Sequence, residues 1–90
     1  MNSTDYLGLK ADYALETQIG GRRFGTIEVI FNSTIASFTD NSTRDVPTNG
    51  TQGDEFAVQV QSGELEVLFG AFGGHGSVDL AMSFKLIAVP

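Results

Sequence analysis

Two long stretches of strict alternation between apolar and polar positions bracket this chain. From Leu7 to Ile19 the odd positions are mainly apolar, and from Ser77 to Val89 the even positions are. Side chains on a β-strand point to opposite faces in turn, so a period of two indicates a half-buried strand. The alternation predicts an all-β fold class and carries no information on function.

Shorter segments of the same kind predict a hairpin directly after the first strand. Gly20-Gly21 is a two-residue turn signal, because both glycines accept a positive φ without steric cost. The partner strand covers about residues 23–31, and Gly25 within it marks a β-bulge. Both faces of this strand carry β-branched and aromatic residues, as strands prefer.

Three further strands are expected between this hairpin and the C-terminal strand. A short strand covers residues 34–39, and a second hairpin runs from Phe56 through the turn Ser62-Gly63 to Phe69. No stretch has apolar residues at helical spacing, so we expect little or no helix.

Six strands predict a single domain over residues 1–90, an antiparallel β-sandwich or small barrel preceded by an N-terminal arm at 1–6. Its predicted core consists of the inward apolar positions: Leu7, Leu9, Tyr13, Leu15, Ile19, Ile27, Val29, Phe31, Phe56, Val58, Val60, Leu65, Val67, Phe69, Val78, Leu80, Met82 and Phe84.

The two longest strands are too long for a chain of this size to cover by itself. About twelve residues at 3.3 Å each extend roughly 40 Å, whereas five or six residues are usual. Small domains without disulfides rely on a very regular core or on oligomerisation, and this chain of 90 residues has no cysteine. Strand ends and outward apolar residues are therefore candidates for pairing with another protein chain: Ile30, Leu68, Ile87 and Val89.

Charge and composition exclude several partners. The net charge is −6, and the five basic residues are scattered, so we expect no nucleic-acid binding. No apolar run reaches the ~20 residues that span a bilayer, and the first residues lack the basic and apolar regions of a signal peptide. We therefore expect no membrane partner, and the compartment stays open, with a virion or another extracellular assembly among the candidates.

The sequence supports no catalytic set. His75 is the single histidine, and Ser77 and Asp79 share its strand parity, which resembles a Ser-His-Asp arrangement. A triad needs a base held rigidly by its orienting group and an oxyanion hole, and a glycine-rich loop supplies neither. We predict a protein that is not an enzyme and uses no cofactor.

Two loops carry the candidate binding residues. The segment 40–55 is rich in turn formers and longer than most loops of a compact domain, and 70–77 is glycine-rich. The acidic residues of the segment 40–55 match no EF-hand spacing, so we predict no metal site. If the two loops formed one ligand site, an aromatic ring would stack on the ligand and polar groups would bond to it. The candidate residues are Phe72, His75, Asp40, Asp45 and Asp54.

All four asparagines lie in Asn-X-Ser/Thr sequences, namely Asn2, Asn32, Asn41 and Asn49. In a secreted protein these positions would accept glycans. The alternative, which we favour, is that Asn, Ser and Thr cluster because all three suit turns.

The strand length and the absence of a catalytic set favour a non-enzymatic structural protein. We expect a small all-β subunit that oligomerises or decorates a larger assembly, such as a viral or phage particle or a filament. The alternative is a carbohydrate-binding module that uses the 40–55 and 70–77 loops. The scarcity of Tyr and the lack of Trp weigh against that alternative.

Overall fold

The structure, a computed structural model, describes residues 1–74 and 76–90. Within these residues it contains six strands and no helix. The described residues therefore include no helix long and apolar enough to cross a membrane. The all-β prediction is confirmed. The strands are β1 (Tyr6–Thr17), β2 (Arg22–Phe31), β3 (Ala36–Ser42), β4 (Asp54–Gln61), β5 (Glu64–Ala71) and β6 (Val78–Ala88).

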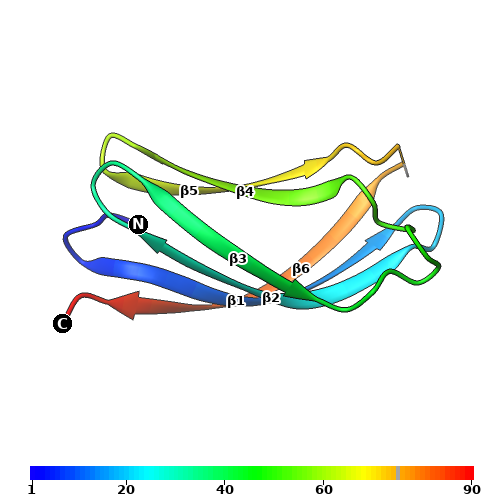
Figure 1. Ribbon diagram of the computed structural model, residues 1–90, viewed down its shortest axis with the longest axis horizontal. Coiled ribbons are helices and arrows are strands. Elements are labelled where there is room, and N and C mark those ends of the chain that lie inside the picture. The colour runs from blue at the N-terminus through cyan, green and yellow to red at the C-terminus, as the bar shows by residue number, and fades with distance from the viewer. Residues whose placement is uncertain (75) are drawn as a thin grey trace.

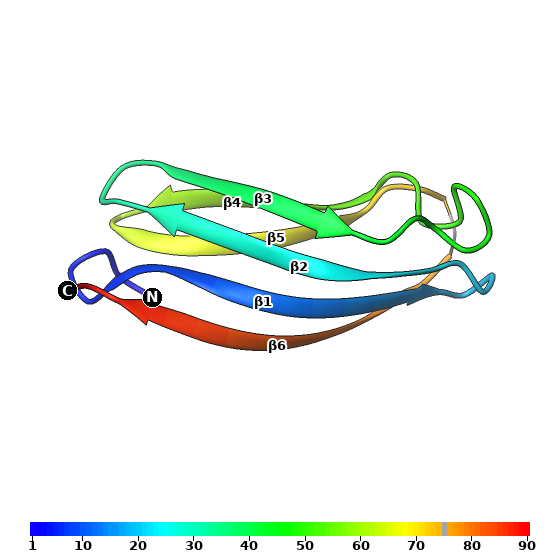
Figure 2. The same cartoon turned by 60° about the horizontal axis from the view of Figure 1, so that its bottom comes forward.

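The strands form two antiparallel sheets. Four strands in the order β3-β2-β1-β6 make the larger sheet, and the β4-β5 hairpin makes the smaller one. The hairpin lies across one face of the larger sheet, and β1 lies at its centre (Figures 1 and 2). The molecule is elongated along the strands, with extents of 42 × 21 × 16 Å.

The core lies between the two sheets and follows the alternation of β1. Every second residue of β1 from Leu9 to Leu15 is buried, opposite Ile27 and Val29 of β2. Tyr13 makes an edge-to-face contact with Phe56 of β4 at 4.9 Å between ring centres. Such contacts stabilise a core by about 1 kcal/mol beyond the area that they bury.

Three predicted core residues are exposed. Leu7 lies at the register shift between Tyr6 and Gly8, and Ile19 lies beyond the end of β1, with 69% of its surface exposed. Phe84 has the inward parity but is 61% exposed, because β6 diverges from the hairpin toward its C-terminal end (Figure 1). Conversely Ala11, which the prediction omits, is buried.

Several strand limits also differ from the prediction. β1 ends at Thr17 rather than at Ile19, β3 covers Ala36–Ser42 rather than 34–39, and β4 begins at Asp54 rather than at Phe56, so the long loop shortens to 43–53. β5 continues to Ala71, which shortens the glycine-rich loop to 72–77. At the first turn only one of the two glycines, Gly20, has a positive φ, of 89°.

The predicted bulge at Gly25 is wrong. Gly25 pairs regularly with Tyr13 on one side and Ser42 on the other. A Cβ atom at this position would lie 2.4 Å from the carbonyl oxygen of Asn41, so the glycine serves a close approach of backbones. The register shift lies instead in β1, next to Gly8, whose Cβ would lie 1.9 Å from the carbonyl oxygen of Val29.

We predict that Gly8→Ala lowers the free energy of unfolding by about 1–3 kcal/mol, because the added methyl group forces backbone shifts in the central strand. Urea denaturation measures the change. Gly63→Asn is the control, because Gly63 has a φ of 77° and no atom within 4 Å of an added Cβ, and Asn tolerates that conformation. Equal effects of the two substitutions would contradict the steric explanation.

Candidate functional site

The structure brings the two predicted binding loops together at one end of the molecule. The backbone N–H of Phe72 donates to the carbonyl oxygen of Gly53 at 3.2 Å, and that of Gly73 donates to Asp54 Oδ1 at 3.1 Å. Phe72 is 81% exposed, and its ring lies over Gly70, whose added Cβ would be 2.0 Å from the ring. Another predicted binding residue, His75, lies outside the described residues.

Each of the three predicted aspartates accepts a hydrogen bond from a different residue of the fold. Asp40 lies in β3 rather than in the loop and accepts a hydrogen bond from Tyr13 Oη at 2.7 Å. Asp45 accepts from the backbone N–H and the hydroxyl of Thr51, whereas Asp54 is buried and accepts from Gly73. Among the described residues, no group of three or more His, Cys, Asp or Glu side chains could hold a metal ion.

Arg23 connects these aspartates to the core. Its side chain donates to the carbonyl oxygen of Asp54 at 2.9 Å and to the Thr51 hydroxyl at 3.3 Å. Its guanidinium carbon also lies 5.8 Å from the centre of the Tyr13 ring. From the sequence Arg23 counts only as one of five scattered basic residues. The parity that it shares with Ile27 and Val29 is the signal that places it inside. These contacts close one end of the sandwich with a polar cluster.

Burial raises the pKa of Tyr13 above its ordinary value of 10.0, and the hydrogen bond to Asp40 raises it further. Both effects favour the neutral phenol in the folded protein. The Tyr13–Asp40 contact thus belongs to the folded state only while the phenol is protonated.

A different surface lies along the outer edge of β6. β6 pairs with β1 and has no second partner strand in the part of the chain that the structure describes. We call this edge, together with its inward side chains Phe84 and Leu86, the β6 edge. These two side chains are 61% and 47% exposed, although the residues opposite them on β1, Ala11 and Leu9, are buried.

The arrangement of β5 and β6 explains this exposure. The two strands are joined through residues 72–77, and β6 then runs away from β5 toward its own C-terminal end (Figure 1). The inward residues near the start of β6 are partly buried, and those near its end are exposed. The sandwich is therefore closed at one end of β6 and open at the other.

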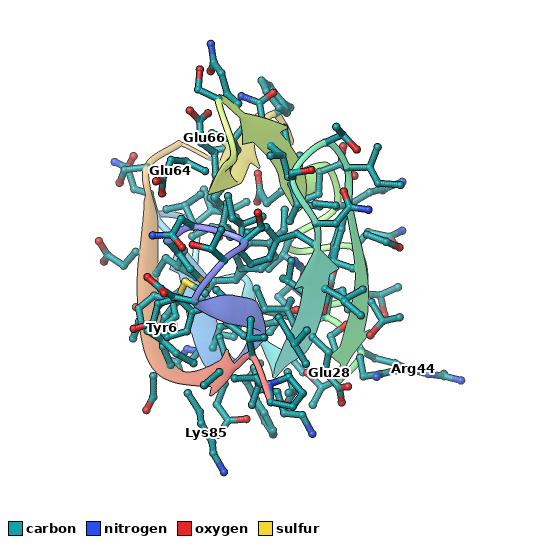
Figure 3. The ribbon with its side chains drawn as sticks, turned by 90° about the vertical axis from the view of Figure 1, so that its left-hand side faces the viewer. Tyr6, Glu28, Arg44, Glu64, Glu66 and Lys85 are labelled. Carbon is teal, nitrogen blue, oxygen red and sulfur yellow. The ribbon has the colours of Figure 1, made fainter. Side chains whose placement is uncertain are left out.

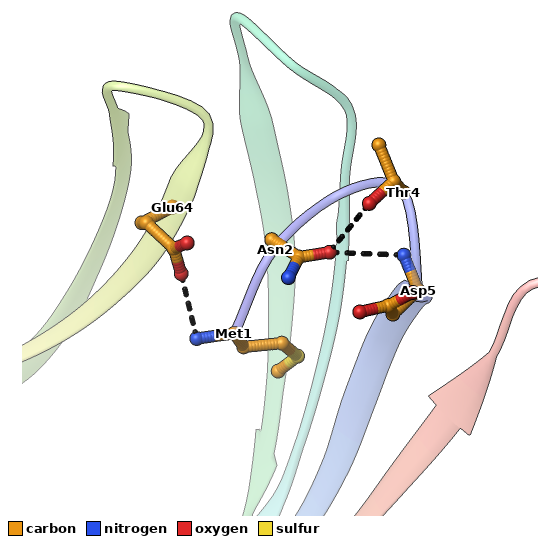
Figure 4. Close-up of polar contacts among 5 residues, drawn as sticks. All are labelled: Met1, Asn2, Thr4, Asp5 and Glu64. Carbon is orange, nitrogen blue, oxygen red and sulfur yellow. Dashed lines mark hydrogen bonds and ion pairs between the residues drawn. The ribbon is translucent and has the colours of Figure 1, made fainter.

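The N-terminal arm contacts the start of the free edge of β5 and leaves the β6 edge uncovered. The Leu65 N–H donates to the carbonyl oxygen of Met1 at 2.9 Å, and the amino group of Met1 lies 2.9 Å from Glu64 Oε2. Asn2 Oδ1 accepts from Thr4 and Asp5 and holds the arm in a turn (Figure 4). The arm thus occupies the start of the β5 edge.

The asparagines of the sequence motif have local roles in most cases. Asn32 Oδ1 accepts from the backbone of Thr34 and Ile35, just as Asn2 Oδ1 caps its own turn. Asn49 has a φ of 62°, a conformation that asparagine tolerates better than most residues, and Asn41 lies in β3. Three of the four positions therefore fit the turn explanation.

The outer face of the larger sheet is hollowed beside β6. A groove of about 830 Å³ is lined by Ala14, Ala81 and the exposed side chains Phe24 and Val46, and Asp79 borders it. The small residues at 14 and 81 lie opposite each other on β1 and β6. Sequence reasoning does not single out Phe24, although its even parity in β2 is the signal that directs it outward.

Comparison with family models, with curated proteins and with solved structures finds no match for this chain. The function is therefore argued from the residues described above.

We predict that Tyr13→Phe lowers the free energy of unfolding by about 1 kcal/mol at neutral pH, because Asp40 loses its donor. The wild-type protein has its full stability below pH 10 and loses part of it as the pH rises further, since the unfolded phenol ionises before the folded one. Denaturation at a series of alkaline pH values should show a flatter loss for Tyr13→Phe. Tyr6→Phe keeps the Tyr13–Asp40 contact and should retain the wild-type loss; a Tyr13→Phe curve as steep as that control would disprove this role.

Proposed function

We propose that this chain is a non-enzymatic structural subunit that assembles with copies of itself through the β6 edge. The observation that carries the proposal is the exposure of Phe84 and Leu86 beside an edge strand of eleven residues. An edge strand presents a row of backbone N–H and C=O groups that can pair with another strand. Apolar side chains beside that row add a gain from burial.

The edges at β3 and at the start of β5 are less suited to pairing. β3, at the opposite end of the larger sheet, carries the polar run Thr39 to Ser42, and the inward charge of Asp40 is a common device against pairing. The start of β5 is occupied by the N-terminal arm. These features favour β6 as the assembling edge.

The assembly that we propose is a repeated one, such as the decoration of a viral or phage particle or a filament. The length of β6 supports the first contact of such an assembly, because a strand of eleven residues offers many backbone pairs. Exposed apolar residues elsewhere on the surface, among them Ile30 and Leu68, offer additional contacts.

We expect sedimentation at increasing protein concentration to show a reversible increase in mass. Phe84→Ser should weaken this self-association by about tenfold or more, because burial of a large apolar side chain contributes about 1.5–3 kcal/mol. Ile35→Ser is the matched control and should leave association unchanged, because Ile35 is at least as exposed as Phe84 and lies in the turn before β3. A stable monomer at every concentration would refute the proposal.

A second candidate function is carbohydrate binding by the loops at 43–53 and 72–77. The observation that favours it is Phe72, the most exposed large apolar side chain of the described residues, at the place where the two loops meet. The engagement of Asp40, Asp45 and Asp54 in contacts within the fold leaves fewer polar groups for a ligand.

A glycan array tests the second candidate. If the loops bind a sugar by stacking, Phe72→Ala should abolish the binding, because stacking on an aromatic face requires the ring. Phe24→Ala removes an exposed aromatic ring from the outer face of the larger sheet and should leave it intact. An array on which the wild-type protein binds nothing would remove this candidate.

A further inference from the structure

We infer that a second copy of this chain pairs with β6 in one register, antiparallel, with the two-fold axis at Met82. The inference deepens the proposed function and rests on it. It follows from the charges on the outer face of β6, from the exposed residues on its inner face and from their spacing about Met82.

The outer face of β6 carries two charges, Asp79 and Lys85, and each lies opposite a like charge on β1. Asp79 is paired in register with Glu16, and Lys85 with Lys10. Like charges directly opposite each other in a sheet are destabilising. Lys85 points away from the smaller sheet, and neither residue forms an ion pair with any residue that the structure describes (Figure 3).

A two-fold axis at Met82 gives both Asp79 and Lys85 an opposite charge on the side away from β1. Asp79 and Lys85 are equally distant from Met82 along the strand, so Asp79 of each copy lies opposite Lys85 of the other. Symmetry produces the ion pair twice. An axis at Ser83 would place Asp79 opposite Ile87, and an axis at Ala81 would place it opposite Ser83. Among these neighbouring registers, the one at Met82 is therefore distinguished by charge.

The same register covers the exposed residues of the inner face. Phe84 of one copy comes opposite Leu80 of the other, and Leu86 comes opposite Val78. Leu80 and Val78 lie where β6 starts and the sandwich is closed, and Phe84 and Leu86 lie where it is open. The open end of each copy thus receives apolar side chains from the closed end of its partner.

The ion pairs would also join two rows of charge that are incomplete in one copy. In one row Glu28 and Lys10 lie side by side across β2 and β1, and Lys85 adds an unbalanced positive charge. In the other, Arg22 forms an ion pair with Glu16, and Asp79 adds an unbalanced negative charge. The register at Met82 places the two unbalanced charges next to each other, and the combined row is neutral.

A charge-reversal cycle tests the register. In Asp79→Lys or Lys85→Asp, each ion pair across the axis becomes a like-charge pair, so the dissociation constant of the dimer should rise about tenfold or more. The double variant D79K/K85D should restore wild-type association. An equimolar mixture of the two single variants should form a mixed dimer as tight as the wild type, because each copy then presents the charges that the other lacks.

A change in net charge cannot produce this pattern of weakened single variants and restored association in the double variant and the mixture. Both single variants keep a negative net charge and therefore repel each other overall, since the wild-type chain carries −6. Asp79→Lys also makes the chain less negative, which by itself would strengthen association. Within one copy each single variant relieves a like-charge pair, so urea denaturation should show monomers at least as stable as the wild type. A weaker dimer is then not a consequence of misfolding.

A cysteine at the axis gives an independent measurement. Directly opposite residues of antiparallel strands have Cα atoms about 4.5–5.5 Å apart, within the range of a disulfide. The wild-type chain has no cysteine, so Met82→Cys should form one homodimeric cross-link on mild oxidation. Ala88→Cys, which the register holds far from its own copy, should form none under the same conditions.

The outcomes separate the register from the proposed function. A dimer that is insensitive to both charge reversals, or that cross-links through position 88 and not 82, overturns the register and leaves self-association standing. A wild-type chain that stays monomeric at every concentration overturns both. Weakened single variants together with a restored mixture support the inference.

Discussion

The structure depends on one constraint, the central position of β1 with a partner strand on each side. β1 pairs with β2 over nine residues and with β6 along nearly its whole length. Because its neighbours satisfy its backbone on both sides, its inward side chains from Leu9 to Thr17 can be buried under the hairpin. Tyr13 then links the two sheets, through its ring to Phe56 and through its hydroxyl to Asp40.

The unequal size of the two sheets follows from this arrangement and has the main functional consequence. A hairpin of two strands cannot cover four strands along their full length. At one end the polar cluster around Arg23 fills the space between the sheets, and the loops meet there. At the other end β6 diverges from the hairpin, so apolar residues with the parity of the core remain exposed. The sequence implies that the long strands exceed what the chain can cover. In the structure the cause is that two strands face four, and the uncovered apolar residues lie mainly on β6.

Much of the fold is predictable from the sequence, because local alternation and turn residues carry the information. The strands, their order along the chain and the parity of the core residues follow from it. The failures share one physical cause, which is that parity gives the direction of a side chain and not what lies in that direction. Phe84 has inward parity without cover, and Arg23 has inward parity with partners that lie far away in the sequence. Gly25 looks like a bulge because the sequence does not reveal how closely β3 approaches it.

By itself the sequence determined the fold class, the two faces of each strand and the positions of the turns, because these depend on neighbours within a few residues. Only the tertiary structure decided which side of the larger sheet is left uncovered and which aspartates have partners within the fold. It also placed Asp79 opposite Glu16 and Lys85 opposite Lys10, a pairing set by register between distant strands. The alternation at the two ends of the chain therefore predicted two long strands. Their pairing made one of them the buried centre of the sheet and the other its exposed edge.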